Sequence, residues 1–578
     1  MSHDNNEPTA SESLNFIERI IEEHNKTGKF NQQVHTRFPP EPNGFLHIGH
    51  AKAICINFET AKKYGGKTNL RFDDTNPLAE KTDFVEAIQK DIKWLGYDWG
   101  EQLYFTSDYF QTLYNYAVDL IKKELAYVDF STPEEMNLQK REGKASPYRD
   151  TDATTNLERF EKMKNGGYEE GECALRLKID MQADNRHLRD PLIYRIIKAA
   201  HHRTGDTWCI YPMYDWAHGQ SDSIENITHS LCSLEFENHR PLYDWCQEKL
   251  DITRTQQIEF SRLNLDYTVT SKRKLKELIE ADLVSGWDDP RMPTLSGMRR
   301  RGYTPASIRN FIDRAGVSKR DQFLALSSLE ASVRDDLNKV APRAMAVLNP
   351  LKVVITNYPE GKTEQMTVEN NPEDEQAGSR KVPFSREIYI EQEDFGTEGI
   401  NKKWKRLAPD RNVRLKGAYI INCHDHKRDA AGNITEVHCT YYKDSKSGED
   451  TSGVKAKGTL HWVSIADAIP AQVNLYDRLF SDPKPTGHKQ TVLDAEGKPV
   501  TDKKGKEVKE TVDFKEFLNP NSLQTITAYI EPSLKTAKVG QGFQFLRLGY
   551  FAVDSDSNAD QLIFNRTATL RDSWSNRS

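Results

Sequence analysis

The chain has 578 residues, of which 37% are hydrophobic and 29% are charged, and its formal net charge is −7. This length is too great for one hydrophobic core, so we expect about three to five domains. The negative charge argues against indiscriminate coating of nucleic acid but leaves local basic patches open. The sequence has neither a signal peptide nor the run of about 18 apolar residues that a membrane helix needs, which predicts a cytoplasmic protein.

The seven cysteines form no CxxC pair and have no histidine pair at zinc-ligand spacing beside them. We therefore expect neither a disulfide framework nor a structural zinc site. The adjacent His201 and His202 would point about 100° apart on a helix, which makes a shared metal site poor. The sequence thus predicts no metal-binding residues.

The first part of the chain alternates helix and strand patterns after a polar tail over residues 1–12. Such alternation predicts a doubly wound parallel sheet, whose ligands lie beyond the carboxyl ends of its strands. His47, His50 and Asp73 all lie at such ends. The expected elements are helices over about 13–25, 51–64 and 84–95 and strands over 34–38 and 69–72.

The pattern becomes mixed from about residue 110 to 203, where an alternating run over 172–179 predicts a strand. We interpret this region as an insertion between two halves of the nucleotide fold, which resumes over 208–260. Residues 275–348 are mainly helical, with amphipathic stretches near 305–315 and 329–341.

After Pro350 the chain consists of short β-rich runs separated by turn residues, which is typical of barrels or sandwiches. A polar, lysine-rich stretch over 484–510 predicts a mobile excursion rather than a core element. The β-rich runs cover 352–356, 413–421, 437–442 and 459–463.

The stretch from Arg37 to His50, RFPPEPNGFLHIGH, is the most specific signal in the chain. It joins a strand, a glycine-containing turn and a helix start, which together bring backbone amides against phosphate. The histidine side chains add hydrogen-bond donors that can stabilise the negative charge that develops on a phosphate group during its transfer. The spacing of neither the dinucleotide fingerprint nor the Walker loop is present. The tetrapeptide His47-Ile48-Gly49-His50 resembles the HIGH signature of class I aminoacyl-tRNA synthetases.

A second segment, Tyr267 to Lys274 (YTVTSKRK), resembles the KMSKS loop of the same class. A mobile lysine at Lys272 would neutralise the β- and γ-phosphates as pyrophosphate departs. Val269 and Thr270 stand where that class has lysine and methionine, whereas Ser271 and Lys272 match its pattern.

Further segments resemble the glutaminyl-tRNA synthetases of bacterial type, and the resemblance extends over nearly the whole chain. It implies ATP-dependent activation of glutamine to an adenylate and transfer to the 3′-terminal adenosine of tRNA(Gln), with release of AMP and pyrophosphate. It also implies Mg²⁺ that accompanies the nucleotide without a dedicated protein site, and a monomeric protein. The matching segments are 38–44, 71–77, 211–215, 230–236, 286–293 and 299–303.

The fold that this resemblance implies is multidomain, α/β followed by β. A split Rossmann-type catalytic domain contains an inserted acceptor-stem-binding domain, and a helical connector leads to two anticodon-binding β-barrels, the distal one (about 370–470) inserted in the proximal one. The expected limits are 1–26 for the N-terminal tail and helix, 27–109 and 208–265 for the catalytic halves, 110–207 for the insertion, 266–345 for the KMSKS-type loop and connector, and 346–578 for the barrels.

The resemblance also assigns functional residues. It assigns catalysis to His47, His50 and Lys272. The ATP-binding residues it implies are Glu41, Pro42, Asn43, His47, Ile48, Gly49, His50, Ala51, Lys52, Ala53, Ser233, Arg262, Leu263, Thr270, Ser271 and Lys272. The tRNA-binding residues it implies are Arg343, Lys403, Arg406, Arg414, Gln544, Arg547, Lys319 and Arg320.

For glutamine, the resemblance implies Asp73 and Tyr214 as direct contacts, with Arg37 and Gln257 around them. The Asp73 carboxylate would pair with the α-ammonium group. The Tyr214 hydroxyl would accept from the side-chain amide, a group that glutamate lacks. Taken alone, Asp73 could also be a helix N-cap and Tyr214 a core tyrosine.

Two alternatives to a glutamine-specific enzyme remain at this point. A glutamyl-tRNA synthetase of non-bacterial type shares several motifs but carries arginine where this chain has Cys232. A substrate carboxylate needs a cation, so Cys232 in the pocket favours a neutral amide substrate. A catalytically silent tRNA-binding paralogue would have no chemical need for His47, His50 and Lys272.

Overall fold

The computed structural model describes residues 14–502, 504–572 and 574. Two structural units divide the chain: Met1–Asn264 with Ile312–Phe323 form the first, and Leu265–Phe311 with Leu324–Ser578 form the second. The polar tail predicted over 1–12 lies outside the described residues. Within the described residues, no helix combines the length and hydropathy that crossing a membrane requires.

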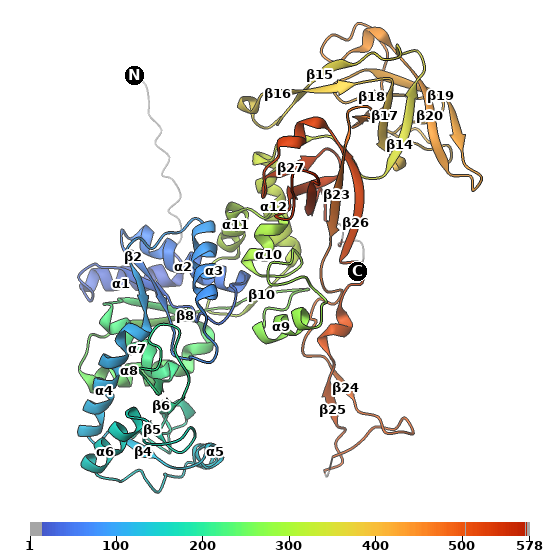
Figure 1. The fold of residues 1–578 in the computed structure, drawn as a ribbon. Helices are drawn as coiled ribbons and strands as arrows, with labels where there is room; N and C mark the ends of the chain where they lie inside the picture. The colour runs from blue at the N-terminus through green and yellow to red at the C-terminus, as the bar shows by residue number, and fades with distance from the viewer. Residues whose placement is uncertain (1–13, 503, 573, 575–578) are drawn as a thin grey trace, which may run out of the picture. The chain divides into compact units, whose positions relative to one another are not determined.

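The first unit is built on parallel strands, as the alternating pattern predicts (Figure 1). One sheet has the order β1-β2-β3, and a second parallel pair is formed by β8 and β9. Helix α2 packs against β1 and β2, which places its N-terminus beyond the end of β1. The elements are α1 (Phe16–Thr27), β1 (His35–Phe38), α2 (Ile48–Lys63), β2 (Lys67–Phe72), α3 (Thr82–Trp94), β3 (Leu103–Phe105), β8 (His229–Ser233) and β9 (Gln256–Phe260).

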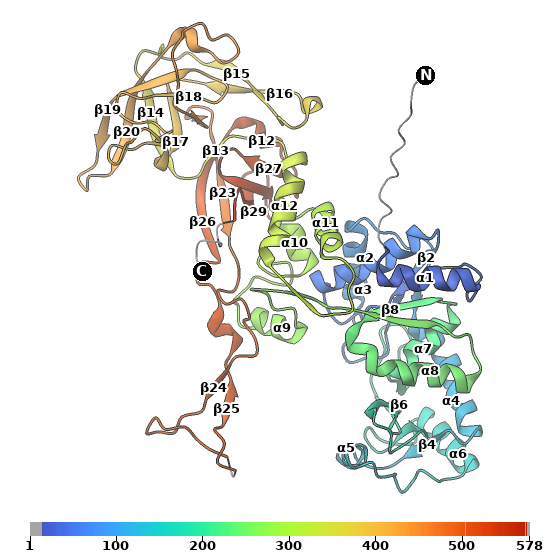
Figure 2. The same cartoon turned by 180° about the vertical axis from the view of Figure 1, so that it is seen from behind.

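An antiparallel sheet of four strands, ordered β4-β5-β6-β7, lies between the two parallel parts in sequence (Figure 2). The strand expected over 172–179 is β5. The pattern over 208–215 predicts a return to the nucleotide fold, but β7 still pairs with β6, so parallel pairing resumes only at β8. An alternating pattern identifies a strand without identifying its neighbour. The elements are α4 (Phe110–Lys122), β4 (Ala126–Asp129), α5 (Pro133–Glu142), α6 (Ala153–Lys164), β5 (Ala174–Leu177), β6 (Leu192–Ile196), β7 (Ile210–Pro212), α7 (Tyr214–Ile224) and α8 (Arg240–Leu250).

The helical region predicted over 275–348 is present. The two amphipathic stretches correspond to α11 (Pro305–Ala315) and α12 (Leu326–Val340). The chain crosses between the units at β10 (Leu263–Leu265), α11 and β11 (Gln322–Leu324). The other helices of the second unit are α9 (Lys272–Glu280) and α10 (Leu295–Arg301).

The rest of the second unit is β-rich and contains two sheets of seven strands. The first has the order β12-β27-β28-β29-β23-β26-β13 and combines residues from both sides of the second sheet in sequence. Its strands are β12 (Arg343–Ala344), β13 (Ala346–Val347), β23 (Ile469–Tyr476), β26 (Leu523–Ile530), β27 (Gly542–Phe545), β28 (Gly549–Val553) and β29 (Ile563–Thr569).

The second sheet has the order β21-β18-β19-β20-β14-β17-β22 and surrounds an apolar core that includes Trp462. The β-rich run predicted over 413–421 is a hairpin, because the chain turns at Gly417, whose φ is +72°. Its strands are β14 (Pro350–Ile355), β17 (Glu387–Glu391), β18 (Asn412–Leu415), β19 (Ile420–Arg428), β20 (Ile434–Tyr441), β21 (Thr459–Leu460) and β22 (Val463–Ser464).

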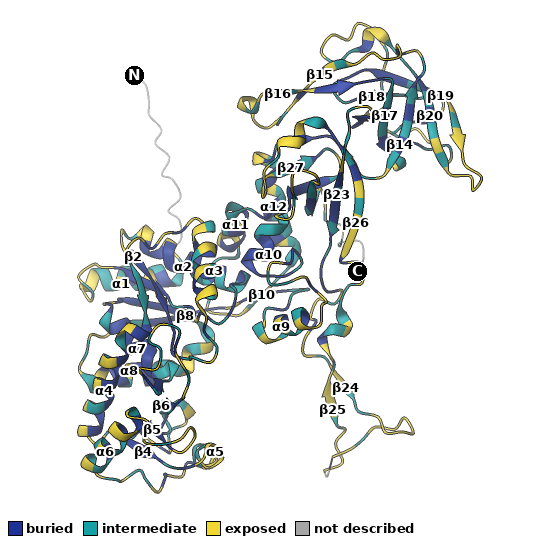
Figure 3. Ribbon diagram, viewed as in Figure 1, coloured by how far each residue is buried: buried dark blue, intermediate teal, exposed yellow. Residues whose placement is uncertain are grey.

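Two further pairs of strands stand outside these sheets: β15 (Glu364–Glu369) with β16 (Ser379–Phe384), and β24 (Lys489–Thr491) with β25 (Lys509–Thr511). The second pair lies in the excursion predicted over 484–510. Its described residues are mainly exposed (Figure 3), which agrees with a segment that contributes little to a core.

Candidate active site

His47 and His50 form a reciprocal cap at the start of α2. His47 Nδ1 accepts from the Gly49 amide at 3.1 Å, and the His47 amide donates to His50 Nδ1 at 3.1 Å. Because both Nδ1 atoms accept, each neutral ring carries its proton on Nε2. A Cβ at Gly49 would lie 2.9 Å from His47 Cε1, so this cap requires glycine there. The motif thus places two ring donors at a helix N-terminus, which favours anions.

The residues that follow in α2 mainly anchor the helix. Ile48, Ala51 and Lys52 are buried. The Lys52 ammonium donates to the Ser261 carbonyl oxygen at 2.8 Å and to its hydroxyl at 3.0 Å. Burial lowers the pKa of Lys52 to about 8. Its side chain therefore ties α2 to the chain beyond β9, and any contact that this part of the helix makes with a nucleotide must come from its backbone.

The other polar residues predicted to bind ATP in the first unit form two local pairs. The Asn43 side chain donates to the Glu41 carboxylate, and the Asn43 amide donates to the Glu41 carbonyl oxygen at 2.9 Å. Arg262 forms an ion pair with Glu235, which also accepts from the Ser233 hydroxyl at 2.7 Å. The structure therefore brings Ser233 and Arg262 together at one carboxylate. Pro42 and Leu263 are buried and Ala53 is half-buried.

Asp73 follows β2 and is buried, and its amide donates to the Pro40 carbonyl oxygen at 3.0 Å. Its Oδ1 atom has no hydrogen-bond partner in the part of the chain that the structure describes. Burial, and after it the nearby Glu41 carboxylate, raises the pKa of Asp73 to about 7. Asp73 is not the N-cap of α3, a position that Lys81 occupies. A buried carboxylate with an unpaired oxygen is suited to a cationic ligand group.

Tyr214 is the first residue of α7 and stacks on His218, with ring centroids 4.9 Å apart. Its hydroxyl has no hydrogen-bond partner among the described residues. Burial raises the pKa of Tyr214 well above its usual value, and the Cys232 thiol and the Asp73 carboxyl, both nearby, also raise it. The structure therefore brings Tyr214, Cys232 and Asp73 into one region.

Two strand residues complete this region. Burial raises the pKa of the Cys232 thiol, on β8, to about 12, so the thiol is neutral near pH 7. Gln257, on the neighbouring strand β9, donates through its amide to the Phe236 carbonyl oxygen at 3.1 Å and to Glu259 at 3.0 Å. A cavity of about 10 Å³ separates α7 from this strand, and Tyr214 and Gln257 both line it.

Arg37 belongs to a buried charge network behind this cavity. Its Nε lies 3.0 Å from Asp222 Oδ1, and Arg71 Nη2 lies 2.8 Å from the same oxygen. All three side chains are at most 1% exposed. Burial alone would raise the pKa of Asp222, but Arg37, and after it His218 and Arg71, hold that pKa well below its usual range. Arg37 therefore shapes the pocket wall with its charge already compensated.

Sequence reasoning missed Asp222, Arg71 and His218 as members of this network. The available signal was the run from Ala217 to Ser223, which is polar along most of its length although each of these residues is buried. A polar helix can be buried only when its groups find partners. The partner Arg37 lies far away in the sequence, so the run alone could not identify it.

His201 and His202 differ from the expectation that they would point apart. Both side chains reach Asp74: His201 Nε2 donates to its carbonyl oxygen at 2.8 Å, and His202 Nε2 lies 3.2 Å from its carboxylate. The prediction assumed a helix, whereas this segment is a turn closed by hydrogen bonds between His201 and Gly205.

Lys272 lies at the start of α9 in the second unit, after Ser271 at the N-cap and Thr270 before it. Val269 is buried in an apolar cluster with Leu275 and Phe514, which explains an apolar residue where the related loops have lysine. Lys272 belongs to the second unit and His47 to the first. The pairing of these two motifs across the phosphates stays a prediction.

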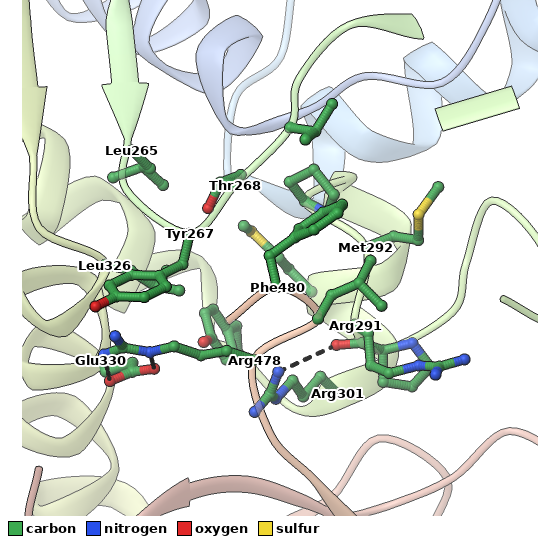
Figure 4. A pocket seen from close by; sticks show the side chains of 16 residues that line it. Leu265, Tyr267, Thr268, Arg291, Met292, Arg301, Leu326, Glu330, Arg478 and Phe480 are labelled. Carbon is green, nitrogen blue, oxygen red and sulfur yellow. Dashed lines mark hydrogen bonds and ion pairs between the residues drawn. The ribbon is translucent and has the colours of Figure 1, made fainter. Parts of the chain in front are cut away.

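The base of this loop borders a cavity of about 50 Å³ within the second unit (Figure 4). Tyr267 adopts a φ of +53°, and its amide donates to the Pro483 carbonyl oxygen at 3.0 Å. The Arg478 guanidinium lies 4.6 Å from the centre of the Tyr267 ring and pairs with Glu330 at 3.2 Å. The loop base is therefore anchored to the segment that follows β23.

The residues predicted to bind tRNA in the second unit are mostly engaged with other protein groups. Arg343 and Gln544 are paired in register on β12 and β27, and Arg343 donates to the Ala341 carbonyl oxygen at 2.8 Å. Arg406 and Arg547 converge on the buried Asp394, with Arg547 at 2.6 Å.

The remaining predicted tRNA contacts are separate from these clusters. Arg414 forms an ion pair with Asp450, and Lys403 is exposed. In the first unit, the Lys319 ammonium lies 5.1 Å from the centre of the Phe16 ring, and the Arg320 amide donates to Ser318.

A split parallel sheet with paired histidines at a helix N-terminus, followed by β-rich domains, has the architecture of a class I aminoacyl-tRNA synthetase. The family model for the catalytic domain of class I tRNA synthetases (E and Q) matches residues 33–339, and the two models for their anti-codon binding domains match 341–442 and 459–554. The chain belongs to this family, with a class I catalytic domain and two C-terminal anticodon-binding domains of β-barrel type.

Curated relatives are similar over nearly their full length. A glutamine–tRNA ligase from Rhodopirellula baltica is 53% identical over 98% of this chain and 91% of the relative. The glutamine–tRNA ligases of Aliivibrio fischeri and Colwellia psychrerythraea are each 52% identical, over 98% and 99% of this chain and 99% of each relative. A solved glutamate tRNA ligase from Elizabethkingia meningosepticum aligns with 53% of this chain and 70% of its own, at 18% identity and a TM-score of 0.39.

Proposed function

We propose that this protein is a glutamine–tRNA ligase. It activates L-glutamine with ATP to glutaminyl-adenylate and transfers the glutaminyl group to the 3′-terminal adenosine of tRNA(Gln), with release of AMP and pyrophosphate. The observation that carries the proposal is the neutral amino-acid pocket, where the Cys232 thiol keeps its proton and the Arg37 charge is compensated by Asp222. The names and high identity of the relatives support the same substrate.

The pocket suits both ends of glutamine. The unpaired Asp73 oxygen would accept from the α-ammonium group in a charge-assisted hydrogen bond. The Tyr214 hydroxyl would accept from the side-chain amide. A glutamate carboxylate has no proton to donate there and would meet no uncompensated cation. The pocket would therefore reject glutamate by leaving its charge buried without a partner.

The ATP chemistry would rest on both signature motifs. The Nε2 protons of His47 and His50, together with the first amides of α2, would stabilise negative charge on the phosphates. Lys272 would neutralise charge that develops as pyrophosphate leaves. Mg²⁺ would arrive bound to the nucleotide and balance the same phosphates.

The β-rich domains would bind the anticodon region of the tRNA. Unstacked loop bases are recognised by their exposed edges and by stacking. Arg406 and Arg547 would have to share Asp394 with the RNA, whereas Lys403 is exposed to solvent. We further propose that the protein acts as a monomer in the cytoplasm and that its domain limits follow the family pattern.

The test is aminoacylation of tRNA(Gln) with labelled glutamine and, separately, with labelled glutamate. We expect charging with glutamine only, and Lys272→Ala should reduce the rate about 10²- to 10³-fold. Lys276→Ala is the matched control, because Lys276 lies one turn further along α9 and pairs with Glu280. Equal charging with glutamate would refute the substrate, and full activity of Lys272→Ala would refute the role of the loop. Binding of tRNA without any charging would indicate a silent paralogue.

A further inference from the structure

His187, Asp215 and His239 form a cluster in the first unit that the proposed reaction does not use. His239 Nδ1 lies 2.5 Å from Asp215 Oδ1, and the two imidazole rings have their centroids 3.9 Å apart. One potential ligand atom from each residue lies within 4.8 Å of the others. All three side chains are half-buried, so an ion could reach them from solvent.

The fold holds these three residues on separate, anchored segments. Asp215 lies in the first turn of α7, and His239 directly precedes α8. His187 lies in a short 3₁₀ turn, where its amide donates to Asn185 Oδ1 at 3.0 Å. The Asn185 side chain in turn donates to the Asn238 carbonyl oxygen at 2.8 Å. Asn185, which precedes the turn of His187, is therefore hydrogen-bonded to Asn238, which precedes His239. This bond holds the two imidazole rings side by side.

A second group in the same unit, Asp74 with His201 and His202, is held by more hydrogen bonds to the protein. His201 donates from Nε2 to the Asp74 carbonyl oxygen, and its Nδ1 accepts from the amides of Arg203 and Thr204, both at 3.2 Å. Both ring nitrogens of His201 are thus engaged, and His202 engages its Nε2 with the Asp74 carboxylate at 3.2 Å. By contrast, neither ring nitrogen of His187 has a hydrogen-bond partner among the described residues, and of His239 only Nδ1 has one.

We propose that His187, Asp215 and His239 bind a divalent transition-metal ion such as Zn²⁺. Two imidazoles and one carboxylate are ligands that this class of ion accepts, with further coordination positions left for water. The Lys140 ammonium lies near His187, and the Asp215 carboxylate supplies the negative charge that offsets this cation near a bound ion.

A bound ion would connect three segments that surround the small cavity beside Tyr214. Asp215 and His239 line this cavity together with Phe236 and Gln257. Phe236 contacts both Tyr214 and His239, with ring centroids 5.1 Å and 5.5 Å apart. Occupancy would therefore stiffen the wall that carries Tyr214. Metal binding itself does not depend on the proposed amino-acid substrate.

The test uses the full chain, stripped with a chelator and titrated with Co²⁺, whose visible absorption reports imidazole coordination. We expect one equivalent to bind, with displacement by Zn²⁺. His187→Gln and His239→Gln should each weaken binding at least tenfold. His202→Gln, in the group of Asp74, is the matched control and should bind like the parent chain.

A second measurement covers the case in which a substitution disturbs folding. Zn²⁺ should raise the Tm of the parent chain and of His202→Gln but not that of His187→Gln, because an ion that binds only the folded state stabilises it. Circular dichroism without metal checks that the variants are folded. Absence of Co²⁺ binding to the parent chain, unchanged binding in His187→Gln, or loss confined to His202→Gln would each overturn the proposal.

Discussion

The proposed amino-acid pocket of the first unit and the arginine-rich surface of the second unit hold their polar groups in opposite ways. In the pocket, Asp73 Oδ1 and the Tyr214 hydroxyl have no hydrogen-bond partner among the described residues, while Arg37 behind them is paired with Asp222. On the β-rich surface, Arg547 and Arg414 already bind Asp394 and Asp450. A small ligand can satisfy unpaired pocket atoms directly, whereas RNA must exchange existing partners. This difference predicts sharp selectivity for the amino acid in the pocket. On the surface, it predicts smaller contributions to RNA binding that differ from residue to residue.

The largest expected effect comes from breaking the buried network that supports the pocket. Asp222→Asn removes the charge that compensates the buried Arg37 and one of the two carboxylates, with Glu225, that pair with the buried Arg71. We expect the free energy of unfolding to fall by about 3–5 kcal/mol, measured by urea denaturation. The exposed Asp206 provides the control, since Asp206→Asn should change stability by less than about 0.5 kcal/mol. A loss below about 1 kcal/mol for Asp222→Asn would show that the network does not support the pocket.

A pH profile examines the unpaired carboxylate itself. With a pKa of about 7, Asp73 is protonated below that pH, and only its carboxylate can pair with the glutamine ammonium. The value of kcat/KM for glutamine should therefore fall about tenfold for each pH unit below 7 and level off above it, at saturating ATP and tRNA. Asp73→Asn should lower activity throughout and remove this dependence. A profile of the parent enzyme that stays flat down to about pH 5.5 would contradict the assignment.

Tyr214→Phe tests the other unpaired pocket atom. Loss of one hydrogen bond to the amide should raise the KM for glutamine about 5- to 30-fold and leave the KM for ATP unchanged. Tyr116→Phe, on α4, serves as the control and should have no effect on either constant. If the KM for glutamine did not change in Tyr214→Phe, the hydroxyl would not be a recognition group.

The smallest effect is expected on the β-rich surface. Lys403→Ala removes an exposed ammonium and should raise the KM for tRNA about two- to fivefold without altering stability. Arg547→Ala should both raise this KM and destabilise the fold, because it leaves Asp394 buried with one partner fewer. Thermal unfolding of the two variants separates the cases. If both variants were equally destabilised, an arginine that is already paired with a protein carboxylate would not differ from an exposed lysine in its structural role.

Most of the helices and strands that local patterns predicted lie near their observed positions, with α11 over the same residues. These patterns failed where the outcome depends on a partner. β7 pairs with β6 rather than starting the second parallel part. The adjacent His201 and His202 share Asp74 because their segment is a turn and not a helix.

The sequence by itself determined the family and the position of the two signature motifs. Such motifs are short and continuous, and the cap formed by His47, Gly49 and His50 follows from neighbouring residues alone. Only the tertiary structure decided which charges compensate one another. Arg37 pairs with Asp222, which lies 185 residues away along the chain, and His187, in a turn between β5 and β6, lies beside His239. Pairing between distant segments is fixed by packing, so neither the compensated pocket nor the proposed metal site can be identified from spacing along the chain.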